Sequence, residues 1–101
     1  EAETNSLFRL TGVAIVAHRQ QRPADAEAAM KQMIAEHGDN ALYQQAQVLA
    51  QWGDNAAALD RLDAAVIEID AGLMYSQTDP FVDPLRSDPR FAQLLKKLGF
   101  A

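Results

Sequence analysis

The chain has 101 residues, which is enough for one compact domain, and it carries a net charge of −5 at pH 7. This acidic balance argues against nonspecific binding to nucleic acid and against attachment to anionic membranes. Because the sequence contains no cysteine, disulfide bonds, thiol catalysis and thiolate metal sites are excluded.

Hydrophobic residues make up 49% of the chain, and many of them are alanine, which favours helices over sheets. The most apolar run, Leu7 to Ala17, contains Arg9 and is too short to span a bilayer, so no membrane insertion is expected. No secretory signal is visible. We expect a cytoplasmic protein, or a periplasmic one if its parent is anchored in a membrane. The chain starts at Glu1 rather than Met, which suggests a piece of a longer protein.

A first helix is expected from about residue 6 to 20, after polar residues 4–6 that offer capping side chains. Its apolar residues nearly encircle it, so it needs cover on two sides, from neighbouring helices or from a preceding repeat that this chain lacks. The β-branched run Val13–Val16 is also compatible with a strand. We reject the strand because no second strand-like run exists to pair with it.

A second helix is expected over about 23–37, with Pro23 in the first helical position, where its fixed φ and missing donor cost nothing. Gly38 is expected to end this helix. Its apolar face consists of Ala26, Met30, Met33 and Ile34.

Two further helices, about 40–52 and 55–70, are expected to fold back on each other at Gly53, which suits the left-handed conformation that ends a helix. Asp or Asn side chains at 39–40 and 54–55 can cap them. Their apolar faces consist of Leu42, Ala46, Leu49 and Ala50, then Ala58, Leu62, Ala65, Val66 and Ile69.

The segment Ala71 to Thr78 interrupts the helical pattern at Gly72, and we expect Leu73, Met74 and Tyr75 to form a buried anchor there. Three Asp-Pro pairs follow, and in each the Asp can cap a helix that begins at the Pro. These pairs are Asp79-Pro80, Asp83-Pro84 and Asp88-Pro89.

The pairs predict a short helix from Pro80 to about Arg86 and a final helix from Pro89 to Leu98. The final helix has an apolar face of Phe91, Leu94, Leu95 and Leu98. Gly99 is expected to stop it, with Phe100 folded back on the last turn.

Residues 42–65 resemble a tetratricopeptide repeat (TPR), a helical hairpin that recurs about every 34 residues. The matching residues are Leu42, Ala46, Leu49, Gly53, Ala58, Leu62 and Ala65. The sequence departs from the consensus at Leu42, where Trp is preferred, and at Asp70-Ala71, where a closing Pro is usual. The first pair of helices aligns with the second at a spacing of about 32 or 33 residues, which suggests a degenerate copy of the same repeat.

The end of the chain is similar to the end of TPR regions found at the carboxy terminus of large bacterial signalling proteins, including adenylate cyclases and winged-helix regulators. The similarity begins at Arg22-Pro23-Ala24. The other matching residues are Gly53, Asp54, Leu62, Asp70, Gly72, Leu73, Asp79, Pro80, Pro84, Leu85, Arg86, Asp88, Pro89, Arg90 and Phe91. The resemblance implies membership of a multidomain regulator rather than one particular activity.

The expected fold is therefore all-α: a right-handed, TPR-like array of antiparallel helical hairpins with a C-terminal capping helix. Hairpin 6–37, hairpin 40–70 and the capping segment 71–101 are expected to form a single domain over residues 1–101. The resemblance implies a non-catalytic protein–protein interaction or scaffolding module of a bacterial signalling or regulatory protein. Its partner is expected to be a protein, a peptide or a second copy of the chain. The alternatives are a regulatory domain that senses a small ligand and an accessory domain of a larger enzyme.

In TPR domains the first helix of each hairpin lines a concave groove, and the resemblance places the candidate binding residues there. They are Leu10, Ala14, Ala17 and His18 in the first hairpin, and Tyr43, Gln47, Ala50 and Gln51 in the second. The Lys, Arg and Asn residues that clamp a peptide carboxylate in TPR grooves are absent, so a carboxylate clamp is not expected. The remaining groove is small and mildly polar, and the chain's own tail can line it.

No residue pattern predicts a catalytic, metal or cofactor site. His18 and His37 lie at helix ends without an acidic residue at a metal-ligand spacing. The Asp-Pro pairs lack the Gly and the terminal Glu of a calcium loop, so capping is favoured. Ser76 and Ser87 have no nearby histidine or nucleophile-elbow glycines, which argues against a hydrolase.

Two arginines near the last helix are expected to hold the tail together. Arg86 and Arg90 flank the helix start beside Asp83 and Asp88, and surface ion pairs between these residues are favoured over ligand binding.

Overall fold

A computed structural model describes residues 2–68 and 70–99. This part of the chain contains only helices and no β-strand, so the all-α prediction is confirmed, and Val13–Val16 lies inside the first helix. In chain order the elements are α1 (Ala2–Arg19), α2 (Pro23–His37), η1 (Gly38–Ala41), α3 (Leu42–Gln51), α4 (Asn55–Glu68), η2 (Ala71–Tyr75), η3 (Pro80–Leu85) and α5 (Pro89–Lys97), where η denotes a 3-10 helix.

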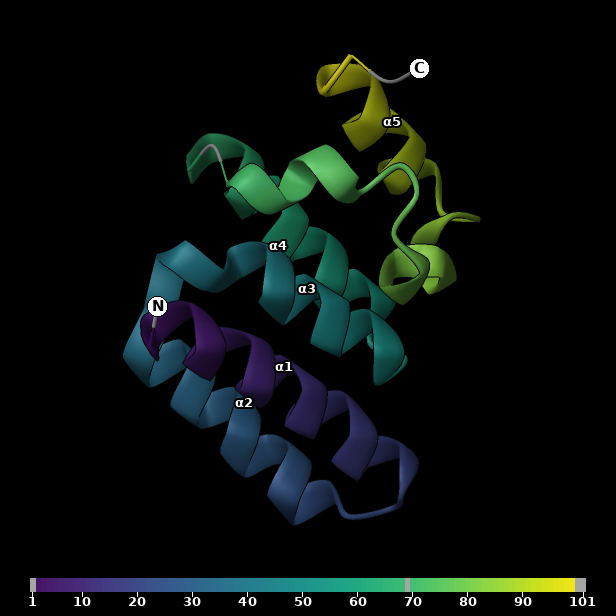
Figure 1. Cartoon of the computed structure of the whole chain (residues 1–101). Coiled ribbons are helices and arrows are strands. Elements are labelled where there is room, and N and C mark those ends of the chain that lie inside the picture. Colours follow the sequence, from purple (N-terminus) through teal and green to yellow (C-terminus); the bar gives the residue numbers. More distant parts are fainter. Residues whose placement is uncertain (1, 69, 100–101) are drawn as a thin grey trace.

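Helices α1 and α2 lie side by side and antiparallel (Figure 1). The predicted cap at residues 4–6 is wrong, because α1 begins at Ala2 and already includes these residues. No Gly or Pro precedes them to stop the helix from extending. The chain reverses through Gln21, whose φ is 60°. Pro23 then takes the first position of α2, as predicted.

Helices α3 and α4 form the second antiparallel pair. Gly53 ends the first of them with a φ of 88°, and the Asp54 carboxylate accepts a hydrogen bond of 3.2 Å from the Ala57 N–H, so both predictions for this turn are confirmed. The predicted cap at 39–40 is wrong. There η1 leads directly into α3, which starts at Leu42 without a side-chain cap, because the turns of η1 continue into the helix.

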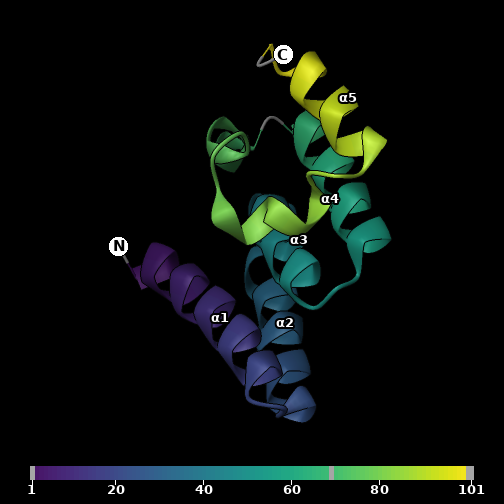
Figure 2. The same ribbon diagram turned by 90° about the vertical axis from the view of Figure 1, so that its right-hand side faces the viewer.

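Helix α3 lies in the middle of the molecule, with α1 and α2 on one side and α4 and η3 on the other (Figures 1 and 2). Seven of its ten residues are buried. One continuous core joins both hairpins to the tail, and the predicted helix faces supply most of it. The fully buried members with the largest side chains include Leu10, Met33, Leu59, Leu62, Leu85, Phe91 and Leu94. Small Ala46, Ala58 and Ala65 are fully buried between the packed helices.

The apolar surface of α1 is covered on one side only. Leu10, Ala14 and Ala17 are buried against the rest of the chain, whereas Val13 and Val16 stay exposed. Neighbouring helices therefore cover one of the two sides of α1 that were expected to need cover.

The tail crosses α3 through η2 and η3, and α5 then packs against α4 (Figure 2). The predicted three-residue anchor is wrong in part, because Leu73 is buried but Met74 and Tyr75 are 71% and 66% exposed. A 3-10 helix has three residues per turn, so Leu73 and Ser76 share the inward side while the two residues between them face outward. Ser76 is fully buried and its Oγ donates to the Leu73 carbonyl.

Two of the three Asp-Pro pairs start helices as predicted. The Asp79 carboxylate accepts from the Phe81 N–H and the Asp88 carboxylate from the Arg90 N–H, both at 2.9 Å. The prediction is wrong for Asp83, because η3 continues through Pro84. Gly99 follows α5 with a φ of 85°, and the expected contact of Phe100 lies outside the described residues.

The ion pairs of the tail are only partly those expected. Arg86 pairs with Asp83 at 2.6 Å, as predicted. Arg90 reaches across to α4 and pairs with Asp60 at 2.9 Å and Asp63 at 2.8 Å instead of with Asp88, whose carboxylate is engaged in capping. Arg90 thus joins α5 to α4.

Candidate functional site

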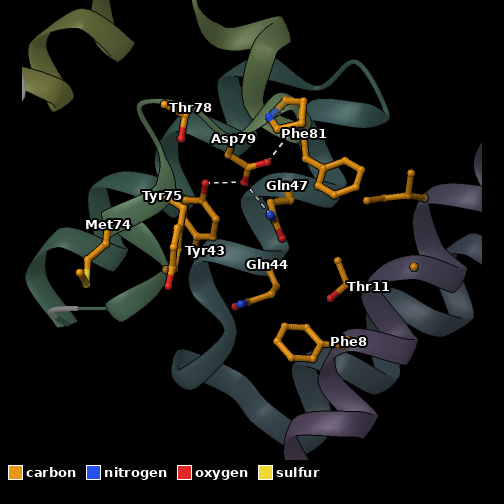
Figure 3. A pocket seen from close by; sticks show the side chains of 14 residues that line it. Phe8, Thr11, Tyr43, Gln44, Gln47, Met74, Tyr75, Thr78, Asp79 and Phe81 are labelled. Carbon is orange, nitrogen blue, oxygen red and sulfur yellow. Dashed lines mark hydrogen bonds between the residues drawn. The ribbon is translucent and has the colours of Figure 1, made fainter.

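A groove with a volume of about 820 Å³ runs between α1 and the tail, with α3 as its floor (Figure 3). We call it the α1–tail groove. Its lining consists of Phe8, Thr11, Gly12 and Ile15 from α1, Tyr43, Gln44 and Gln47 from α3, and Gly72, Met74, Tyr75, Thr78, Asp79, Pro80 and Phe81 from the tail. Most of these side chains are apolar, and only one carries a charge at neutral pH.

Asp79 is the polar centre of the groove (Figure 3). Its Oδ2 accepts hydrogen bonds from the Tyr43 hydroxyl at 2.6 Å and from Gln47 Nε2 at 2.7 Å. Its Oδ1 accepts from the Phe81 N–H at 2.9 Å. A carboxylate has about four acceptor positions, so three are filled and one, on Oδ1, is left. The residue is 9% exposed.

Tyr43 anchors the tail at three points. Its backbone N–H donates to Asp70 Oδ2 at 3.1 Å, its hydroxyl donates to Asp79, and its ring lies directly against Gly72. Burial, and then the hydrogen bond to the Asp79 carboxylate, raise the pKa of the Tyr43 phenol well above its usual range. Tyr43 is therefore a neutral donor that fixes Asp79, and its role in the groove is to position the tail.

Gln51 and Asn55 bind backbone carbonyls of η3 on either side of the Pro84 ring. Pro84 has no N–H for the carbonyl three residues earlier, that of Phe81, and Gln51 Nε2 donates to this carbonyl at 2.9 Å. Asn55 Nδ2 donates to the Pro84 carbonyl at 3.3 Å. The Gln51 bond replaces the one that Pro84 cannot donate, and the Asn55 bond fixes the end of η3 to the start of α4.

Arg86 joins the turn around Asp79 to the last helix. Its Nη2 donates to the carbonyls of Asp79 at 2.9 Å and Ser76 at 3.4 Å, and its guanidinium lies 5.4 Å from the centre of the Phe91 ring. These contacts, together with the pair to Asp83, tie the turn around Asp79 to the last helix.

Exposed apolar side chains form the rim of the groove. Phe8 on α1 is 63% exposed and faces Tyr75 and Phe81 across the groove (Figure 3). Met74 adds a flexible apolar group on the tail side. Large exposed apolar groups around a hollow mark a surface that can bind an apolar partner.

The structure brings together only two of the residues that the sequence placed in a binding groove. Tyr43 and Gln47 line the α1–tail groove, where both bind Asp79. Gln51 binds η3 instead. Leu10 and Ala14 are core residues, as are the neighbouring Ala17 and Ala50. The tail packs on α3 and lines the groove there, an arrangement that the sequence analysis allowed.

His18 lies outside the groove, at the end of α1. Its ring stacks on Trp52 with 5.6 Å between ring centres, and Trp52 Nε1 donates to the Ala14 carbonyl at 3.1 Å. These contacts link the ends of the two hairpins and give His18 a packing role.

Phe8, Tyr75 and Phe81 are groove residues that the sequence did not indicate. Each is a single aromatic residue with no periodic partner, and they line one groove only because the tail folds back across α3. The sequence feature that pointed to this region was the Asp79-Pro80 pair, which predicted an ordered helix start at Asp79.

The residues described by the structure contain no group of three His, Asp or Glu side chains placed to hold a metal ion. Within the same part of the chain, no helix has the length and apolar character needed to cross a membrane. Comparison of the chain with protein-family models, with curated proteins and with solved structures finds no match.

Proposed function

We propose that this chain is a non-catalytic, TPR-like interaction module that binds an apolar segment of a partner protein in the α1–tail groove. The module is proposed to serve a bacterial signalling or regulatory protein, in line with the resemblance of the chain from Arg22 onward to the ends of such proteins. Within a larger enzyme the same module would act as an accessory domain.

Two features support the helical-repeat part of the proposal. The hairpins α1–α2 and α3–α4 are joined through α3, which contacts both helices of the first pair. The small residues of the TPR consensus, Ala46, Ala58 and Ala65, are fully buried where the helices approach each other. We propose a right-handed array that the tail caps.

The observation that carries the binding part is the α1–tail groove itself. The groove is an open hollow of about 820 Å³, and Phe8 and Tyr75 in its lining are more than half exposed. Two of the seven aromatic residues in the chain are therefore largely in contact with water in this groove. Leaving such side chains in water costs free energy that a partner's apolar side chain would recover, at about 25 cal/mol per Å² of buried apolar surface.

A peptide-display selection tests this proposal, with the double variant Phe8→Ser/Tyr75→Ser as the loss-of-binding arm. Both side chains are exposed, so the variant keeps the core. Ile67→Ser on α4 is the matched control, because Ile67 is 78% exposed and lies outside the groove. We expect selected peptides that bind the wild type and the control but not the double variant. Selection of no peptides, or of peptides that bind all three proteins equally, would refute the proposal.

A regulatory domain that senses a small ligand is the second candidate, and the size of the groove favours it. Pockets for small ligands typically measure about 300–1,000 Å³, and the α1–tail groove lies in this range. A metabolite panel read by thermal shift tests it, since a ligand stabilises the fold by RT ln(1 + [L]/Kd). A ligand whose stabilising effect disappears in Phe8→Ser/Tyr75→Ser would favour sensing over protein binding.

Self-association is one form of the interaction role. Sedimentation at micromolar concentration is expected to show dimers if the groove or the exposed face of α1 pairs with a second copy. A strict monomer would remove this form of the proposal and leave a different protein as the partner.

A further inference from the structure

The Asp79 carboxylate at the base of the α1–tail groove can accept a further hydrogen bond. It receives three bonds from the described residues and has room for about four, which leaves one position on Oδ1.

Two donors that reach Asp79 and one on α1 are already engaged. The Tyr43 hydroxyl and Gln47 Nε2 both donate to Asp79, and the Thr11 hydroxyl donates to the Leu7 carbonyl at 2.8 Å. A ligand that binds the Asp79 carboxylate must therefore bring its own donor.

The electrostatics of the groove select a cation. Asp79 is the one charged side chain among the lining residues, and the whole chain carries −5. The nearby Arg86 guanidinium is occupied by backbone carbonyls, by Asp83 and by the Phe91 ring. An anionic ligand would be repelled, whereas a cation would be attracted. The low dielectric constant of the apolar lining strengthens this attraction.

The aromatic rings of the groove are free to receive that cation. Phe8, Tyr75 and Phe81 make no ring stacking or cation–π contact with any described residue. A guanidinium or ammonium over the face of such a ring is attracted by the negative face of the ring, more strongly where water is displaced. Aromatic faces next to a carboxylate are thus well suited to bind a basic side chain.

We infer that the α1–tail groove binds an arginine side chain flanked by apolar residues in a segment of the partner protein. The planar guanidinium both stacks on an aromatic ring and donates several N–H groups, which matches rings beside the Asp79 carboxylate. The apolar neighbours of the arginine occupy the rim formed by Phe8 and Met74. This inference rests on the proposed function and adds the chemistry of the partner.

Binding of three short capped peptides, measured by fluorescence anisotropy, tests the inference. They carry a central arginine, glutamine or glutamate between the same leucine residues. We expect the arginine peptide to bind about tenfold more tightly than the glutamine peptide, and the glutamate peptide to bind least. The arginine preference should shrink in high salt, which screens the attraction.

Variants locate the effect. The preference for arginine should persist in Ile67→Ser and fall at least severalfold in Tyr75→Ser, which removes an exposed ring. Asp79→Asn keeps the shape of the carboxylate and removes its charge, so it should abolish most of the preference. Circular dichroism checks that each variant is folded, and if Asp79→Asn unfolds, Tyr75→Ser and the peptide series decide the question.

Three results would overturn the inference. Equal affinity for arginine and glutamine peptides that Phe8→Ser/Tyr75→Ser removes would leave an apolar binding groove and only the proposed function standing. Binding of none of the peptides would reject the arginine partner, while the display selection decides the proposed function separately. Dimerisation that the groove variants abolish would assign the groove to a second copy.

Discussion

Gly72 has no side chain because the ring of Tyr43 occupies the space, and the substitution Gly72→Ala tests this contact. A Cβ added at Gly72 would lie 2.7 Å from the Cγ and Cδ2 atoms of Tyr43 and 2.8 Å from its Cβ. These distances are shorter than carbon atoms tolerate. The ring cannot move aside freely, because the hydroxyl of Tyr43 is bound to Asp79 and its backbone N–H to Asp70.

The sign of the effect separates this contact from ordinary glycine behaviour. At a site whose backbone suits alanine, Gly→Ala stabilises a protein by about 0.4–1 kcal/mol through the unfolded state. Forcing an extra methyl group into a packed site costs about 1–3 kcal/mol. We expect a net loss of about 1–2 kcal/mol, which lowers the Tm by roughly 5–15 °C for a domain of this size.

Thermal and urea unfolding followed by circular dichroism measure this loss. Gly12→Ala is the matched control, because Gly12 lies within α1 and nothing lies within 4 Å of the added Cβ. The control should gain up to about 1 kcal/mol from the higher helix propensity of alanine. A Gly72→Ala protein as stable as the wild type, or more stable, would refute the packing of the tail on Tyr43.

Two further predictions concern the links that hold the tail. Because the folded state raises the pKa of Tyr43, its contribution to stability is complete below the unfolded value near 10 and is lost as the pH rises above it. Tyr43→Phe should therefore unfold more easily at neutral pH, by about 1–3 kcal/mol for the bond lost to Asp79. It should also lose less stability than the wild type between pH 9 and 11.5, and parallel pH profiles would contradict this reasoning. Arg90→Ala removes the exposed pairs with Asp60 and Asp63, so its Tm should fall at low salt and approach that of the wild type in 1 M NaCl. A deficit independent of salt would mean that Arg90 acts by packing.

The sequence alone determined the elements that depend on neighbouring residues. The spacing of apolar residues predicted the four long helices and most of the core faces. Gly53 and Asp54 specified the turn between α3 and α4, and Asp88 the start of α5. These features follow from hydrogen bonds between residues no more than four apart, and such bonds leave a local mark in the sequence.

Only the tertiary structure decided what crosses α3. Tyr43 and Asp79 are 36 residues apart, and Arg90 reaches Asp60 over 30 residues. The residues around Tyr43 do not reveal that it anchors the tail. For Arg90, the acid nearer in sequence is Asp88, but its carboxylate caps α5. The α1–tail groove exists because η2 and η3 pack on α3 and leave a hollow between themselves and α1. The partners in such contacts are chosen by the three-dimensional fit of the core.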